Sequence, residues 1–211
     1  MIFHNVEQNT DAWHELRLGK VTASNFGKIM ANATGPFGEP AKRYALQLAL
    51  ERATGRKAAH SFKNDDMERG NEQEPVARML YEEVFFVSVD NGGFFDCGDY
   101  GDSPDGLIGD DGVIEIKSVI ATTHDDTMRR GGFDPAYRWQ IVGHLDCAER
   151  QYVDFISYCE DFPDELQLLV YRVTRDEMAG QIEQLRERRE LFIRSLLEPT
   201  YQRIMNGRSA A

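Results

Sequence analysis

The feature that most constrains the fold is a change of hydrophobic period along the chain. Helical spacing dominates both ends, whereas the middle consists of short runs rich in aromatic and β-branched residues. We expect helices at residues 26–30, 41–53, 71–84, about 135–147 and from about 175 onward. We expect strands at residues 84–89, 94–95, 107–108, 113–117, 152–158 and 167–173. Helices before and after a central block of strands predict a mixed α/β layered fold.

Turn-forming residues predict how the short strands connect. The Asn-Gly-Gly sequence at residues 91–93 predicts a hairpin between the runs 84–89 and 94–95. A Gly-Asp-Asp-Gly turn at residues 109–112 predicts a second hairpin between the two strands that follow.

The chain has 211 residues and a mass of 24.1 kDa, which is the size of one large domain. No linker rich in Pro, Gly or Ser divides it, so we expect a single domain over residues 1–211. Pro75 fits the predicted helix only within its first turn, where the missing N–H has no intrahelical acceptor to lose.

The charge distribution is strongly asymmetric. The chain carries 24 Lys and Arg against 36 Asp and Glu, for a net charge of −12. Residues 1–60 hold 8 basic and 5 acidic residues, whereas residues 61–211 hold 16 and 31. This balance excludes a protein that coats nucleic acid through unspecific phosphate contacts, but it leaves room for a local basic site in the first quarter.

Three cysteines bear on the compartment: Cys97, Cys147 and Cys159. Their odd number and the absence of C-x-x-C spacing argue against a disulfide framework and a structural zinc site. Residues 1–7 show no signal-peptide pattern, and no apolar run is long enough to span a membrane. We therefore expect a cytoplasmic protein without membrane association.

The acidic strand near the middle of the chain carries the strongest chemical signal. Seven carboxylates and no Lys or Arg lie between Asp96 and Glu115, and Lys117 follows. Acidic runs of this kind are most often solvated faces. Because side chains alternate along a strand, Glu115 and Lys117 point the same way, while Ile114 and Ile116 point into the core.

A metal site is the alternative to a solvated face. The turn at residues 103–106 precedes the strand, and strand pairing would bring its Asp105 beside Glu115. Two hard carboxylate oxygens with a backbone carbonyl suit Mg²⁺ or Mn²⁺. Lys117 would then position or deprotonate a water for in-line attack on a phosphodiester.

Other assignments of these acids fit less well. The carboxylates at 99, 102 and 105 are three residues apart and miss the ligand spacing of an EF-hand. A glycosidase carboxylate pair stays possible but leaves Lys117 without a role. The five histidines form no H-x-x-x-H or H-E-x-x-H pair, so we expect most of them at the surface or in helix packing.

Several motifs follow one another in one order between residues 6 and 145. They are Val6-Glu7-Gln8, residues 11–24, Gly70-Asn71 with Glu74 and Ala77-Arg78, residues 103–107, residues 115–117, residues 131–133, and Ala136-Tyr137 with Gln140. In this order they resemble the phage lambda-type exonucleases, the viral recombinase nuclease family. The C-terminal third is similar in layout rather than in motif.

The resemblance implies a restriction-endonuclease-like core, in which helices flank a mixed sheet. It also implies that Asp105 and Glu115 bind the divalent metal, Mg²⁺ or alternatively Mn²⁺, and that Ile116 contributes its carbonyl.

Three further residues receive catalytic roles from the same resemblance. Lys117 would serve the attacking water, Glu74 would support it or a second metal, and Gln140 would orient it. Glu74 is equally explained as a carboxylate in a first helical turn, where Glu72 competes with it. The family's frequent Q-x-Q pattern is broken here by Val142.

A phosphate-binding site is implied near the N-terminus. Arg17, Ser24 and Ser103 match the positions that bind the terminal phosphate in the family. A guanidinium fork, hydroxyl donors and a nearby helix N-terminus together make an anion site. The alternatives are a surface ion pair for Arg17 and a helix cap for Ser24, and we expect Trp13 in core packing.

The activity implied is removal of 5′-mononucleotides from 5′-phosphorylated ends of duplex DNA, which leaves a 3′ single strand for recombination. The implied partners are double-stranded DNA ends, two further copies in a homotrimeric ring, and a single-strand annealing protein. Two other functions stay open. One is a structure-specific or restriction-type endonuclease on the same core, and the other is a non-catalytic DNA-binding or scaffold protein.

Overall fold

The strands form two sheets in the computed structural model, which describes residues 1–58 and 65–209. Within these residues the first sheet has the order β1-β4-β5-β2 and the second the order β3-β6-β7-β8-β9. The first comprises β1 (Ile2–His4), β2 (Val21–Thr22), β4 (Phe94–Asp96) and β5 (Tyr100–Asp102). The second comprises β3 (Asp90–Asn91), β6 (Gly106–Ile108), β7 (Gly112–Ser118), β8 (Tyr152–Tyr158) and β9 (Leu168–Thr174).

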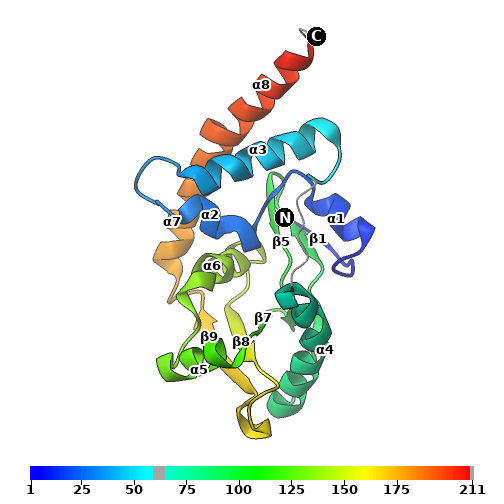
Figure 1. Cartoon of the computed structure of the whole chain (residues 1–211), viewed down its shortest axis with the longest axis vertical. Helices are drawn as coiled ribbons and strands as arrows, with labels where there is room; N and C mark the ends of the chain where they lie inside the picture. Colours follow the sequence, from blue (N-terminus) through cyan, green and yellow to red (C-terminus); the bar gives the residue numbers. More distant parts are fainter. Residues whose placement is uncertain (59–64, 210–211) are drawn as a thin grey trace.

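Helices surround both sheets, as expected for a mixed α/β fold (Figure 1). The helices before the central strands are α1 (Asp11–Arg17), α2 (Phe26–Met30), α3 (Glu39–Thr54) and α4 (Asp65–Phe85), with a 3₁₀ turn, η1 (Ala23–Asn25), before α2. Those after β7 are α5 (Ala121–Arg130), the 3₁₀ turn η2 (Pro135–Tyr137), α6 (Arg138–Cys147), a second 3₁₀ turn, η3 (Asp164–Leu166), and α7 (Ala179–Phe192).

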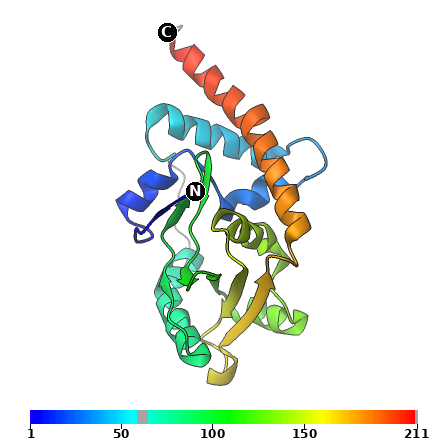
Figure 2. The same ribbon diagram turned by 180° about the vertical axis from the view of Figure 1, so that it is seen from behind.

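The chain ends in one long helical rod. A π-helical segment, η4 (Ile193–Leu197), joins α7 to α8 (Glu198–Ser209). From behind, this rod runs past α3 and away from the sheets, and α8 packs against α3 (Figure 2). Among the described residues no helix is long and apolar enough to cross a membrane.

The strand β7 lies at the centre of the second sheet and is covered on both faces. It pairs antiparallel with β6 and parallel with β8. Val113 belongs to the larger core, which includes α6, whereas Ile114 and Ile116 pack into a smaller core with α4. Because both faces of β7 are covered, even its charged residues lie inside the protein and are largely removed from water.

The predicted hairpin between the runs 84–89 and 94–95 is wrong. The helix α4 continues to Phe85, and Phe86 takes a left-handed backbone conformation and is 94% exposed. Instead of pairing with one another, β3 joins β6 and β4 joins β1 and β5. The aromatic run is therefore a helix end exposed to solvent, and the Asn-Gly-Gly sequence connects two different sheets.

The predicted position of Pro75 is also wrong. The helix α4 begins at Asp65, six residues before the predicted start, so Pro75 lies in its interior. Proline has no N–H, so the carbonyl of Asn71 loses its intrahelical partner there. After Pro75, the helix packs against β7 through Ala77 and Tyr81.

Candidate active site

The strand β7 and the turn before β6 bring Asp105, Glu115 and Lys117 together. The Asp105 N–H donates to the carbonyl of Ile114 at 3.1 Å, and its Oδ2 accepts from the N–H of Ile116 at 2.6 Å. The Lys117 ammonium contacts the carboxylate of Glu115. Strand register therefore places Asp105 beside β7, as the spacing predicts.

Ile116 presents its backbone at the same edge. In a β-strand the N–H and C=O of one residue point to the same side. Since the Ile116 N–H reaches Asp105, its carbonyl faces that side too, where pairing with β6 has ended at Ile114. Ile116 lines the cleft described below, so its carbonyl is available to a ligand.

The carboxylate of Glu115 is enclosed by three hydrogen-bond donors. It is 1% exposed, and Oε1 accepts from Gln140 Nε2 at 2.7 Å and from the Lys117 ammonium. Oε2 lies 2.7 Å from Nε2 of His144. Burial raises the pKa of Glu115, but the charges of Lys117 and His144 outweigh burial and lower it to about 2. Glu115 is therefore ionised at every physiological pH.

Glu74 and Asp105 add negative charge to the same place. Burial raises the pKa of Asp105 well above its usual value, and the charges of Glu115 and Glu74 raise it further. Burial and the charge of Glu115 also raise the pKa of Glu74. The carboxylates of these three residues repel one another. A bound cation would therefore stabilise their ionised forms.

A cleft of about 510 Å³ opens onto these groups. Its wall includes Glu74, Asp105, Ile116, Lys117 and Tyr137. The Lys117 ammonium lies 5.0 Å from the centre of the Tyr137 ring, so the aromatic face restricts its position. Burial lowers the pKa of Lys117, but the charges of Glu115 and Asp105 raise it above its ordinary value.

The donor set fits a hard divalent ion that keeps part of its water shell. In the described part of the chain, no three His, Cys, Asp or Glu side chains form a complete cage for a metal. The site instead offers the carboxylates of Asp105 and Glu115 with the Ile116 carbonyl. Mg²⁺ binds in this way, through one or two carboxylates with water completing its shell.

His144 and Asp102 are part of the site although no sequence signal marked them. His144 is fully buried on α6, and its Nδ1 lies 2.8 Å from Oδ2 of Asp102 on β5. His144 is therefore an exception to the expectation that most of the histidines lie at the surface or in helix packing. Its distance from Glu115 follows from how α6 packs against β5 and β8, which local patterns do not encode.

Two residues of the expected phosphate site lie on either side of Trp13. The Arg17 guanidinium stacks 4.0 Å from the centre of the Trp13 ring. The indole N–H of Trp13 donates to Ser103 Oγ at 2.6 Å, and that hydroxyl donates to the carbonyl of Gly93 at 2.7 Å. Trp13 is 9% exposed, which confirms that it is a core residue.

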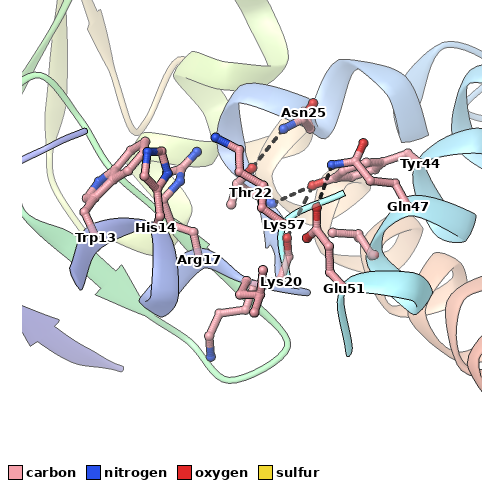
Figure 3. Close-up of a pocket in the computed structure, with 12 residues that line it drawn as sticks. Trp13, His14, Arg17, Lys20, Thr22, Asn25, Tyr44, Gln47, Glu51 and Lys57 are labelled. Carbon is pink, nitrogen blue, oxygen red and sulfur yellow. Dashed lines mark hydrogen bonds between the residues drawn. The ribbon is translucent and has the colours of Figure 1, made fainter. Parts of the chain in front are cut away.

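Arg17 faces a smaller cavity of about 180 Å³, which α1, β2 and α3 enclose (Figure 3). Lys20, Thr22 and Lys57 also line it. Burial lowers the pKa of Arg17, and within the described residues Arg17 makes no ion pair with Asp11 or Glu15. The surface ion pair considered for Arg17 is therefore absent.

Within the described part of the chain, Ser24 makes no hydrogen bond to Arg17 or Ser103. It is exposed on η1, where its Oγ lies 3.5 Å from Oγ1 of Thr22 and from Nδ2 of Asn25. No side-chain cap was found at the start of η1 or α2, so the capping alternative for Ser24 is not observed.

Gly92 permits the close approach that seats the Asp105 turn. A Cβ at this position would lie 1.7 Å from the carbonyl oxygen of Pro104. We expect Gly92→Ala to displace the turn and to lower the DNA hydrolysis that the resemblance implies at least tenfold, since small misplacements of reacting groups are costly. Gly180→Ala is the matched control, because a Cβ there meets no atom. A Gly92→Ala protein with wild-type kcat would contradict this role of the glycine.

A family model for the YqaJ-like viral recombinase domain matches residues 12–151, about two thirds of the chain. The chain belongs to the YqaJ-like viral recombinase family. The matched region contains every residue predicted for the metal site and the phosphate site. No curated protein sequence matches the chain.

Solved structures agree with membership of the YqaJ-like family. An alkaline exonuclease from Laribacter hongkongensis, LHK-Exo, is 32% identical and superposes with a TM-score of 0.84, covering 96% of this chain and 100% of its own. LHK-Exo in complex with dAMP matches over the same shares with a TM-score of 0.85. A phage-related exonuclease from Haemophilus somnus 129PT shares the fold at 15% identity, with a TM-score of 0.65 over 89% of this chain and 96% of its own.

Proposed function

We propose that this protein degrades one strand of linear duplex DNA in the 5′-to-3′ direction, starts from 5′-phosphorylated ends, requires Mg²⁺, and leaves 3′ overhangs for recombination. Family and fold establish the coarser statement that it is a deoxyribonuclease of the exonuclease type. The observation that carries the proposal is the cluster of Asp105, Glu115 and Lys117 at the edge of a cleft.

The residues of the cluster divide the chemistry between them. Asp105, Glu115 and the Ile116 carbonyl would hold Mg²⁺, or Mn²⁺ in its place, and Glu74 would support a second ion. Such an ion supplies neutralisation of the phosphate charge and a water of lowered pKa. Lys117 and Gln140 both contact Glu115 Oε1, so they would hold the attacking water next to the carboxylate.

The bond that breaks determines the end groups of the two products. Water adds to phosphorus, and the 3′ oxygen of the terminal nucleotide leaves. The product is a 5′-mononucleotide, and the shortened strand keeps a 5′-phosphate. LHK-Exo, which is 32% identical, has been solved in complex with dAMP, a mononucleotide. Each turnover therefore regenerates the end group that starts the next one.

The 5′-phosphate would bind near Trp13, between Arg17 and Ser103, with Ser24 at the exposed rim. Stacking on Trp13 holds the Arg17 guanidinium in place, and a fixed fork of donors suits a phosphate. Burial also strengthens the interaction of Arg17 with an anion.

Arg17→Ala is expected to reduce the preference for 5′-phosphate over 5′-hydroxyl ends by about 10- to 100-fold, because a charge-assisted bond contributes about 1.5–3 kcal/mol. Initial rates on two end-labelled duplexes that differ only in the terminal group measure the ratio. Arg203→Ala, an exposed change on α8, is the control. An unchanged ratio in Arg17→Ala would place the phosphate elsewhere.

The wider proposal includes partners and setting. We propose one nuclease domain over residues 1–211, a homotrimeric ring around the DNA, and a single-strand annealing protein that receives the exposed strand. The site of action would be the cytoplasm of a bacterial or phage-infected cell. The segment 32–43 would reach the duplex backbone through Arg43, whereas Lys42 pairs with Glu39 at 2.8 Å.

An end-labelled linear duplex, incubated with the protein and Mg²⁺, tests the activity. The expected products are 5′-mononucleotides released from the phosphorylated strand, with no release when EDTA is present. Cutting of closed circular DNA would favour the endonuclease alternative, and binding without hydrolysis would favour the scaffold alternative. Sedimentation of a stable monomer at assay concentration would exclude the ring.

A further inference from the structure

His144 joins the two sheets behind the candidate active site. Asp102 lies on β5 of the first sheet and Glu115 on β7 of the second. The ring of His144 lies between them, 2.8 Å from Asp102 Oδ2 and 2.7 Å from Glu115 Oε2. All three residues are at most 1% exposed, so water does not replace these contacts.

Each ring nitrogen of His144 is within hydrogen-bonding distance of a carboxylate oxygen, Nδ1 of Asp102 Oδ2 and Nε2 of Glu115 Oε2. The ring is therefore fixed at both ends, which determines its plane and its distance from Glu115. The neighbouring Gly143 sits so close to Ala23 and Phe26 that its helix has no room to shift toward them.

The two oxygens of Glu115 are used differently. His144 takes Oε2 on the buried side, whereas Lys117, which lines the cleft, contacts Oε1. Oε1 is therefore the oxygen on the side of the cleft.

We propose that His144 is a positioning residue for Glu115. Its hydrogen bond to Oε2 leaves Oε1 as the single oxygen that Glu115 offers to a divalent cation. Asp102 fixes the orientation of the His144 ring. This rests on the proposed function, because it assumes that the cluster binds a metal. Hydrogen bonds that orient a ligand typically contribute 10- to 100-fold in metal affinity.

Substitution of His144 by Asn or by Gln distinguishes an effect on the orientation of Glu115 from an effect of removing the charge of His144. The amide nitrogen of Asn replaces Nδ1 and keeps the bond to Asp102, whereas that of Gln replaces Nε2 and keeps the bond to Glu115. Both substitutions remove the ring and its charge. Loss of a positive charge alone would strengthen cation binding equally in the two variants, so a difference between them reports the position of Glu115.

Calorimetric titration of the folded protein with Mn²⁺, without DNA, is the test. We expect His144→Asn to bind Mn²⁺ about 10- to 100-fold more weakly than wild type, and His144→Gln to stay within about threefold. The Mg²⁺ concentration for half-maximal hydrolysis should rise by the same factor in His144→Asn. Equal Mn²⁺ affinities in the two variants would overturn the proposal.

Two further variants keep the test decisive. If His144→Asn does not fold, Asp102→Asn is the second variant, because it loosens the imidazole ring and keeps His144. Asp102→Asn should also bind Mn²⁺ more weakly than wild type. Wild-type affinity of Asp102→Asn for Mn²⁺ would overturn the proposal. His124→Gln is the matched control, since His124 is fully buried but bonds Ser157 and the carbonyl of Leu166 instead. Wild-type protein that neither binds Mn²⁺ nor cleaves DNA would contradict the proposed function itself.

Discussion

Glu115→Gln is expected to reduce kcat for DNA hydrolysis about a thousandfold or more. The substitution removes a negative charge that the site is built around and sets an amide donor against the donors from Lys117, Gln140 and His144. A metal site supplies several kcal/mol of transition-state stabilisation, and each 1.36 kcal/mol corresponds to a factor of ten. Release of nucleotides from an end-labelled duplex at saturating Mg²⁺ measures the loss.

The control for Glu115→Gln is Asp126→Asn, an exposed change of the same kind on α5. Its activity should equal that of wild type. Circular dichroism and thermal unfolding of both variants separate lost chemistry from lost structure. A folded Glu115→Gln protein with more than a tenth of wild-type kcat would remove Glu115 from the catalytic set.

The second large effect concerns stability. Asp154 on β8 is 1% exposed and accepts from Tyr81 Oη at 2.6 Å and from Arg172 Nε and Nη2 at 2.8 and 2.7 Å. Arg172→Ala would leave this carboxylate buried without its cation. The Arg172 side chain is 52% exposed, so solvent screens part of this pair, and Tyr81 still donates to Asp154. We therefore expect the free energy of unfolding to fall by about 1–2 kcal/mol.

Urea unfolding of Arg172→Ala measures this cost. Asp154→Asn in the same background removes the unpaired charge and should recover part of the stability, which a double-mutant cycle quantifies. Arg194→Ala, exposed in the π-helical segment, is the control. If the free energy of unfolding of Arg172→Ala falls by less than about 0.5 kcal/mol, water stabilises the Asp154 carboxylate as well as Arg172 does, and the prediction is wrong.

Local sequence patterns predicted most helices and strands, because each of them is formed by residues that are close together in the sequence. The strand 152–158 coincides with β8, and the turn at 109–112 joins β6 to β7 as expected. The run 84–89 was misassigned because aromatic and β-branched residues suit a strand only where a neighbour is available to pair with them. In the protein Val84 and Phe85 end an exposed helix.

The part of the candidate site that lies on β7 and in the turn before β6 could be predicted from the sequence, because strand geometry sets its spacing. Asp105, Glu115 and Lys117 come together because the turn before β6 and the adjacent strand β7 carry them. Gln140 contacts Glu115 from α6, and its implied role toward the attacking water stays a prediction. The three phosphate-site residues were named together, and Arg17 and Ser103 both contact Trp13, whereas the hydrogen bonds of Ser24 are to Thr22 and Asn25. Its position depends on how η1 turns after β2, and no spacing encodes that turn.

The sequence by itself determined the alternation of helices and strands, the acidic strand with its lysine, and the ordered motifs of the family. Hydrophobic period and motif order are properties of neighbouring residues, so they are visible without a fold. Only the tertiary structure decided that both faces of β7 are buried and that His144 bridges Asp102 to Glu115. Those contacts join residues 29 and 42 positions apart, and long-range packing of α6 against the two sheets sets them.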